Sequence, residues 1–201
     1  MKLYYSPGAC SLSAHIALRE SGLTFTALKA PTKTHQLDDG TDYYTINPLG
    51  YVPLLELADG TRLTEGPAIV QYIADQVPAK NLAPANGTMD RYKLQSWLTF
   101  VGTELHKGFS PLFNPATPDD YKKTTIDRLL SRLTWVDGQL AGKHYLMGDA
   151  FSVADGYLFT VTNWAPRVGV DISGLANIQA FRARVAARPA VQEALKAEGL
   201  A

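Results

Sequence analysis

The only cysteine of the chain, Cys10, follows Pro7-Gly8 and stands just before a segment with the pattern of a helix. The start of a helix carries about half a positive charge and unpaired N–H groups, and both favour a thiolate. The alternative is a small buried side chain, because free cysteine is among the most buried residue types. Ser13 occupies the place of the second cysteine in a C-x-x-C pair, so disulfide chemistry would need a thiol from another molecule.

Two further stretches could bind a ligand largely through the backbone. Val52 precedes Pro53, and a cis bond there would turn the Val52 N–H and C=O toward an extended peptide. The alternative is an ordinary proline at a strand edge. Glu65 and Gly66 begin a helical segment, where the carboxylate can bind an ammonium group and the Gly66 N–H a carboxylate. An acidic residue at a helix start can also serve only the helix dipole.

A polar stripe runs along a later helical segment. Its members are Thr99, Thr103, His106 and Ser110, with Glu104 and Lys107 beside them. The stripe could be an ordinary solvated face. Alternatively, His106 could be positively charged or donate a hydrogen bond to a nearby thiolate.

A short peptide with a thiol would use these groups together. It needs an extended backbone opposite Val52 and an amino acid headgroup at Glu65 and Gly66, with its sulfur near Cys10. Glutathione has all three features. We therefore expect glutathione as the ligand of the first part of the chain.

The elements that must position these residues have the order β-α-β-loop-β-β-α, which is that of a thioredoxin-like domain. A helix between two strand-like runs predicts parallel strands, and the turn Ala58-Asp59-Gly60 predicts a hairpin. The expected strands cover residues 2–5, 25–30, 52–57 and 61–64, and the expected helices cover residues 10–21 and 65–77.

Everything after a linker over residues 78–88 has helical patterns. The expected features are a long helix from about Met89 to Leu112, a helix opened by Thr117 and Pro118, a capping box at Ser152 and Asp155, and two short helices broken at Arg188-Pro189. We expect an α+β protein: a thioredoxin-like, glutathione-binding domain over residues 1–80, followed by an all-α helical domain over residues 88–201.

Composition limits the remaining classes of function. Lys and Arg number 19, as do Asp and Glu, so no charge excess indicates a nucleic acid or membrane partner. One cysteine excludes an internal disulfide and a C-x-x-C metal site, and no targeting or membrane segment is evident. We expect a cytoplasmic protein without a metal, in which His15 and His144 are structural.

With these residues assembled, the chain resembles the glutathione S-transferases, specifically the bacterial beta class. The resemblance covers all 201 residues and rests on YYSPGACSLSAHIALRE, NPLGYVPLLEL, LTEGPAIVQYIADQ, ELHKGFSPLF and FSVADGYLF. It implies a homodimer that uses glutathione as co-substrate, without a metal, and a hydrophobic pocket for a small electrophile.

The resemblance also implies roles for single residues. Cys10 would contact the glutathione sulfur, and Cys10 and His106 would be catalytic. Val52 would pair with the cysteinyl backbone. The implied glutathione contacts are Cys10, His35, Val52, Glu65, Gly66, Thr99, Thr103, Glu104, His106 and Lys107, with Glu104 reaching the site of the partner subunit, and the implied pocket residues are Phe109, Phe113 and Trp164. Relatives carry a lysine near residue 35, so either His35 or Lys33 could hold the glycine carboxylate.

The expected activity is therefore conjugation of glutathione thiolate to hydrophobic electrophiles, halogenated aromatic compounds among them. Two alternatives stay open. One is a glutaredoxin-like thiol transferase acting through a mixed disulfide of Cys10 with glutathione, and the other is a non-catalytic ligand-binding protein. Activation of glutathione by a hydroxyl of Tyr5 or Ser11 also stays open.

Overall fold

A mixed four-stranded sheet forms the centre of the first of two units in the computed structural model, which describes residues 1–201. The sheet has the order β2-β1-β3-β4 and is built from β1 (Lys2–Tyr5), β2 (Thr26–Lys29), β3 (Leu54–Glu56) and β4 (Arg62–Leu63). β1 pairs in parallel with β2 and antiparallel with β3, which pairs antiparallel with β4. The predicted β-α-β unit and hairpin are confirmed.

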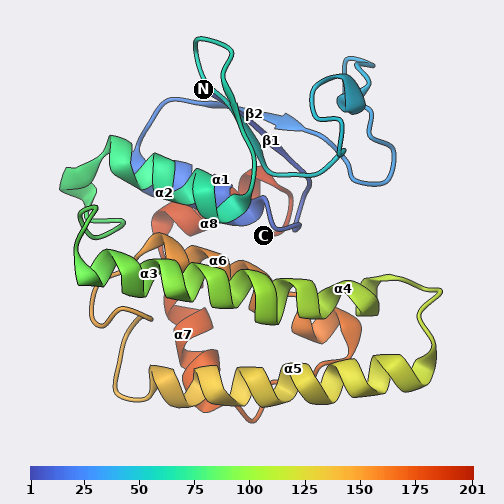
Figure 1. Ribbon diagram of the computed structural model, residues 1–201, viewed down its shortest axis with the longest axis vertical. Helices are drawn as coiled ribbons and strands as arrows, with labels where there is room; N and C mark the ends of the chain where they lie inside the picture. The colour runs from blue at the N-terminus through green and yellow to red at the C-terminus, as the bar shows by residue number, and fades with distance from the viewer. The chain divides into compact units, whose positions relative to one another are not determined.

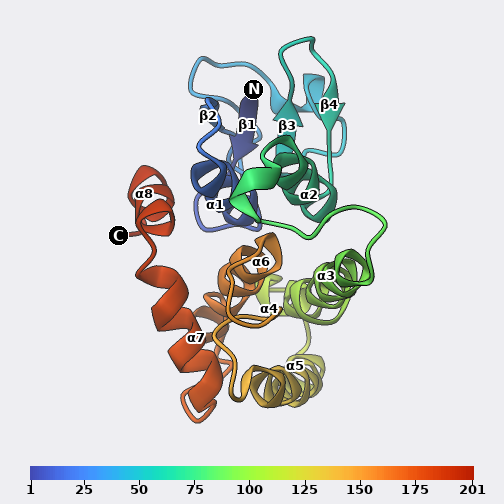
Figure 2. The same ribbon diagram turned by 90° about the vertical axis from the view of Figure 1, so that its left-hand side faces the viewer.

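Three helices complete this unit (Figures 1 and 2). α1 (Leu12–Ser21) connects the two parallel strands, and α2 (Gly66–Gln76) packs against α1. α8 (Pro189–Ala197), from the end of the chain, packs on α1 as well. A short helix, η2 (Pro78–Lys80), follows α2.

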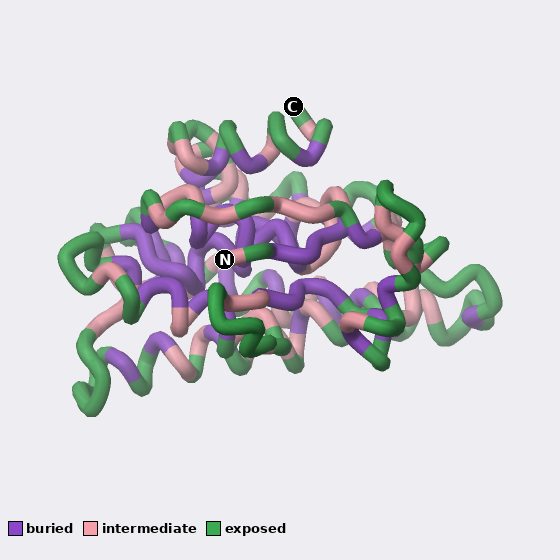
Figure 3. The backbone as a smooth tube through the Cα atoms, turned by 90° about the horizontal axis from the view of Figure 1, so that it is seen from above, coloured by how far each residue is buried: buried purple, intermediate pink, exposed green.

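The C-terminal segment belongs to the first unit, whereas the expected domain ranges place it in the helical domain. The first unit consists of residues 1–85 and 188–201, and the second of residues 86–187. Residues 188–201 belong with the first unit because α8 buries Val191 and Ala194, and the buried positions recur about once per turn along it (Figure 3). The extents of the two domains, 1–80 and 88–201, stay predictions.

The loop between β2 and β3 is anchored by a small core. It contains η1 (Tyr43–Thr45), whose Tyr43 is fully buried against Tyr4, Val52 and Leu54. This core fixes the segment that leads to Val52 on the sheet.

The second unit is helical. Its elements are α3 (Met89–Phe100), η3 (Val101–His106), α4 (Lys107–Phe113), α5 (Asp119–Leu140), α6 (Val153–Thr162), η4 (Ala165–Val168) and α7 (Ala176–Ala186). α3, η3 and α4 follow one another as the expected long helix, but η3 is a π-helix (Figure 1). α6 is buried along its whole length. None of the helices is both long and apolar enough to cross a membrane.

Two of the expected helix starts can be compared with the structure. Ser152 and Asp155 form the expected capping box of α6. At α5, Pro118 is the N-cap residue rather than the first helical residue, so Thr117 does not cap the helix.

Candidate active site

Cys10 lies in the turn between β1 and α1, partly buried. Its Sγ lies 3.1 Å from the Val52 carbonyl oxygen, to which the S–H donates. The amides at the helix start donate to carbonyl groups three residues earlier in the chain, Leu12 N–H to Ala9 O and Ser13 N–H to Cys10 O. These two amides are therefore not the unpaired donors that the sequence led us to expect.

The Val52 segment is held by two side chains that sequence reasoning missed. Tyr43 Oη and Asn47 Nδ2 each donate to the Tyr51 carbonyl, both at 2.8 Å. Burial raises the pKa of Tyr43 to about 12, so its phenol remains a donor. The Val52-Pro53 bond is cis, as expected, and the Val52 N–H has no acceptor within the chain.

Glu65 and Gly66 stand at the start of α2. Glu65 has φ 67° and ψ 111°, is exposed, and does not cap the helix with its side chain. The Gly66 N–H has no acceptor within the chain. A Cβ on Gly66 would lie 3.9 Å from both Pro53 Cγ and Ser13 Oγ. The turn after β1, the Val52-Pro53 segment and the start of α2 therefore meet at one place.

A further tie to this turn comes from the end of the chain. Glu198 accepts a hydrogen bond from the Gly8 N–H at 2.9 Å, and its other carboxylate oxygen lies 2.9 Å from His15 Nδ1. The side chains of His15 and Glu198 are fully buried. His15 is structural, as expected, whereas no signal in the sequence could connect Glu198 with residue 8.

The hydroxyl alternatives receive no support from these contacts. Ser11 is buried and exchanges two hydrogen bonds with the backbone of Ser6, its Oγ accepting from the N–H at 3.1 Å and donating to the carbonyl at 3.2 Å. Burial, and to a lesser degree the Glu198 charge, raise the pKa of Tyr5. Ser11 already donates its hydroxyl proton, and Tyr5 stays a neutral phenol, so neither group is prepared to take the proton of a ligand thiol.

His35 lies in the loop before η1, at φ 51°. Its ring stacks on Tyr44 with 4.5 Å between centroids, and its Nδ1 is buried without a partner. Gly50, at φ 66°, must remain a glycine, since a Cβ would lie 2.7 Å from Tyr44 and 2.9 Å from His35. Lys33 is exposed in the same loop. The contact of either residue with a glycine carboxylate stays a prediction.

In the second unit, His106 ends the π-helix and contacts two residues of the α6 segment. Its Nδ1 lies 2.7 Å from Tyr157 Oη, and its ring lies 5.0 Å from that of Trp164. Burial, with a smaller effect of the Lys107 charge, lowers the pKa of His106 to about 4. His106 is therefore neutral at pH 7, which favours the hydrogen-bond donor over the positively charged alternative.

The rest of the expected stripe is more ordinary. Thr99, Thr103 and Lys107 are exposed, and Thr103 Oγ1 donates to the Thr99 carbonyl. Glu104 accepts from Arg132 at 2.9 Å and Arg128 at 3.3 Å, and these bonds lower its pKa. Its reach to a partner subunit stays a prediction.

The expected pocket residues lie together in the second unit. The rings of Phe109 and Phe113 both stand edge-on to Trp164, with centroids 5.9 and 5.6 Å away. Phe109 is fully buried, whereas Phe113 is 51% exposed. Phe113 therefore offers more surface to a ligand than Phe109 does.

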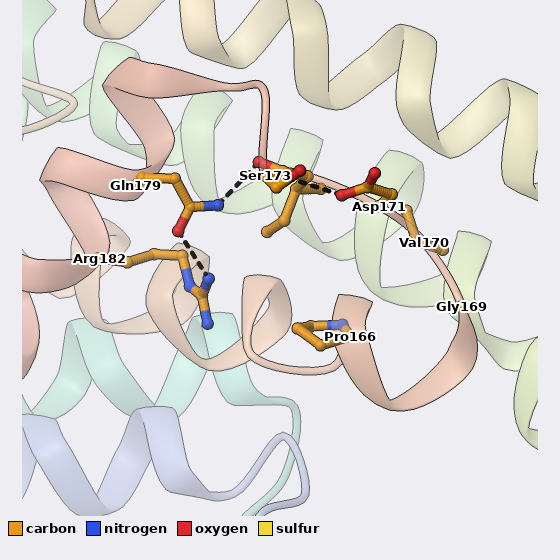
Figure 4. Close-up of a pocket in the computed structure, with 8 residues that line it drawn as sticks. Pro166, Gly169, Val170, Asp171, Ser173, Gln179 and Arg182 are labelled. Carbon is orange, nitrogen blue, oxygen red and sulfur yellow. Dashed lines mark hydrogen bonds between the residues drawn. The ribbon is translucent and has the colours of Figure 1, made fainter.

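A separate hollow of about 610 Å³ lies beside η4 and α7 (Figure 4). It is lined by Pro166, Gly169, Val170, Asp171, Ile172, Ser173, Gln179 and Arg182. Burial lowers the pKa of Arg182, whose guanidinium donates to Asn163 Oδ1 and Gln179 Oε1. None of the candidate residues lines this hollow. The structure groups no three His, Cys, Asp or Glu side chains that could hold a metal ion.

Comparisons with known proteins agree with this geometry. Family models of the glutathione S-transferase N-terminal and C-terminal domains match residues 8–76 and 100–189. Glutathione S-transferase GstA of Escherichia coli O157:H7 is 50% identical over 200 residues, covering 100% of both chains.

Solved structures show the same similarity. A sphingomonad glutathione S-transferase complexed with glutathione is 50% identical, with a TM-score of 0.96. The beta class glutathione S-transferase of Sphingomonas chungbukensis is 49% identical, also with a TM-score of 0.96. Each comparison covers 100% of both chains.

Proposed function

Because the chain belongs to the glutathione S-transferase family and resembles its bacterial beta class, we propose that it binds glutathione at the Cys10, Val52 and Glu65 segments. It is a transferase with glutathione as co-substrate, and the reaction joins the glutathione sulfur to a hydrophobic electrophile. With a halogenated aromatic electrophile, a carbon–sulfur bond forms, the carbon–halogen bond breaks, and halide leaves. The thiol proton passes to solvent.

The conformation of Glu65 carries the binding part of this proposal. A positive φ is uncommon for a glutamate and costs on the order of 1–3 kcal/mol, whereas glycine adopts it freely. The carboxylate does not cap α2, so the helix does not explain it. A ligand ammonium group bound to the Glu65 carboxylate would explain this conformation. The adjacent Gly66 N–H could bind the carboxylate of the same headgroup. The γ-glutamyl end of glutathione has both groups.

The other contacts follow the same arrangement. The Val52 N–H can pair with the cysteinyl backbone of glutathione, which brings the ligand sulfur toward Cys10. The Cys10 S–H, now donated to Val52, could then donate to the ligand thiolate. We include His106 of the second unit as a neutral hydrogen-bond donor in the reaction.

A conjugation assay with a chlorinated dinitrobenzene tests the proposal. We expect a glutathione-dependent rise in product absorbance that saturates with glutathione, together with glutathione binding measured by calorimetry. Binding without turnover would instead identify a non-catalytic ligand-binding protein. No binding would refute the proposed site.

Thiol transfer is a second candidate activity, because Cys10 is partly exposed at this site and the chain has one cysteine. A mixed disulfide of Cys10 with glutathione would need a second glutathione to release it. Mass spectrometry after treatment with oxidised glutathione would detect this adduct.

A homodimer in the cytoplasm is also part of the proposal. Large apolar side chains are exposed on the helices of the second unit: Met89, Tyr92, Tyr121 and Trp135. A second copy could cover them, as closed two-fold dimers are the commonest soluble assemblies. Sedimentation should give twice 21.9 kDa, and a fully active monomer at micromolar concentration would refute the dimer.

A further inference from the structure

The His106 ring is held by two aromatic rings. Tyr157 lies on α6, and Trp164 follows the end of α6 and precedes η4. The Tyr157 ring stands edge-on to the imidazole at 89°, and that of Trp164 at 68°. Tyr157 and Trp164 are 4% and 6% exposed, so neither ring is free to move aside.

The π-helix contributes to this placement. Val101–His106 widens the helical turn just before α4, and π-helical turns recur at functional sites. Val101 and Leu105 are fully buried within this turn and fix its position. His106 therefore points to α6 from a backbone that is anchored on both sides.

The hydrogen bond between Tyr157 Oη and His106 Nδ1 is 2.7 Å long, and its direction depends on the tautomer of the imidazole. A phenol O–H can donate to an Nδ1 that carries no proton. A neutral imidazole that accepts at Nδ1 must carry its proton on Nε2. His106 Nε2 has no partner within the chain and is not among the fully buried polar atoms.

We propose that Tyr157 is a positioning residue that selects the Nε2–H tautomer of His106. The phenol O–H donates to Nδ1, and the opposite nitrogen then presents an N–H to negative charge that develops on a bound substrate. This inference rests on the proposed function of His106. It adds Tyr157 as the residue that determines which ring nitrogen carries the proton. Without the hydroxyl, the ring could adopt the other tautomer, in which Nε2 repels an anion.

Tyr157→Phe tests the inference, because it removes the hydroxyl and keeps the ring. The tautomer is read from ¹⁵N chemical shifts of labelled histidine side chains at pH 7, with the His106 signals identified by their loss in His106→Asn. We expect wild-type Nε2 to be protonated and Nδ1 not, and Tyr157→Phe to populate both tautomers. Conjugation kcat should fall roughly 3- to 10-fold, with KM for glutathione changed less than about 2-fold, as for loss of one hydrogen bond of about 1 kcal/mol.

Thr160→Val is the matched control. Thr160 is also buried on α6, but its hydroxyl donates to the Gly156 carbonyl within the helix. It should leave the His106 tautomer and kcat unchanged.

Three outcomes would overturn the inference. These are a protonated Nδ1 in the wild type, an unchanged tautomer in Tyr157→Phe, and an altered tautomer with wild-type kcat. Failure of the proposed function is separate: full conjugation by His106→Ala would remove the role of His106 but would leave the tautomer measurement unaffected.

Discussion

The two units hold their candidate groups by different means. In the first unit, the groups offered to a ligand are largely backbone atoms, the N–H groups of Val52 and Gly66, around Cys10. The segments that carry them are held by side-chain hydrogen bonds, from Tyr43 to the nearby Tyr51 carbonyl and from the Gly8 N–H to the distant Glu198. In the second unit, one side chain, His106, is held by the rings around it.

This difference determines what each site can tolerate. Most substitutions leave the backbone N–H groups in place, and proline would also change the local conformation, so the first site is best disturbed through its supports. The second site depends on desolvation, which changes the protonation of His106 as well as its position. The predictions below test supports in the first unit and protonation in the second.

The largest expected effect concerns the support from the C-terminus. Glu198→Ala removes the buried carboxylate that bonds to His15 and to the Gly8 N–H, which should lower the free energy of unfolding by about 3–5 kcal/mol. Urea denaturation would measure this. Glu193→Ala, an exposed glutamate on α8 that lies 3.8 Å from Arg19, is the control and should change stability by less than about 1 kcal/mol. Equal effects of the two substitutions would contradict the role of Glu198.

The next effect concerns the protonation of His106. Its pKa falls from 6.5 to about 4 on folding, so the unfolded chain binds more protons between these values. The stability that His106 contributes is therefore present above pH 6.5 and is lost as the pH falls toward 4. We therefore compare the free energy of unfolding of the wild type with that of His106→Asn. The wild-type value minus the variant value should be about 3 kcal/mol larger at pH 7 than at pH 4.

The comparison with the variant is necessary because the contribution of another group to stability changes with pH in the opposite direction. Burial raises the pKa of Asp155 to about 6, so its contribution to stability falls as the pH rises through the same window. Asp155 is present in both proteins, so its contribution cancels when the unfolding free energy of His106→Asn is subtracted from that of the wild type at each pH. His144→Asn, at an exposed histidine of the same unit, is the control. A pH-independent difference would show that His106 is not held in a desolvated site.

Local patterns predicted most of the fold. The strand-like run 2–5 is β1, and the capping residues Ser152 and Asp155 start α6 as expected. The π-helix was missed because Leu94, Leu98, Val101 and Leu105 have the spacing of an α-helix, and one widened turn hardly alters that spacing.

The candidate site was predicted where its groups follow turns or helix starts, as Cys10, Val52 and Gly66 do. Its supports were not, because they depend on side-chain contacts of the folded chain that no local sequence pattern indicates. The Gly8 amide and Glu198 are 190 residues apart. The neutral state of His106 likewise depends on rings that pack around it only in the folded chain.

A smaller effect is expected when Glu65 is replaced by glycine. Glu65→Gly removes the proposed partner of the γ-glutamyl ammonium, and loss of a charged hydrogen bond of about 1.5–3 kcal/mol should weaken glutathione binding roughly 10- to 100-fold. The same change relieves the positive φ, so the protein should become more stable. Calorimetry and denaturation would measure the two effects on one sample.

Asn81→Gly is the matched control, because Asn81 also has a positive φ, 53°, and lies in the first unit. It should leave glutathione affinity unchanged. If Glu65→Gly gained stability and kept its affinity, the ligand would not account for the conformation of Glu65.

The smallest expected effect tests the central claim, that conjugation uses the sulfur of glutathione and not a nucleophile of the protein. Cys10→Ala removes at most one hydrogen bond to that sulfur, about 1 kcal/mol or roughly 5-fold in rate. The direct measurement is the conjugation rate of Cys10→Ala at saturating glutathione, with glutathione affinity and thiol transfer followed in parallel. We predict that conjugation persists within that factor, while thiol transfer and the mixed disulfide disappear. Loss of conjugation in a variant that still binds glutathione normally would contradict this account and make Cys10 the obligatory catalytic group.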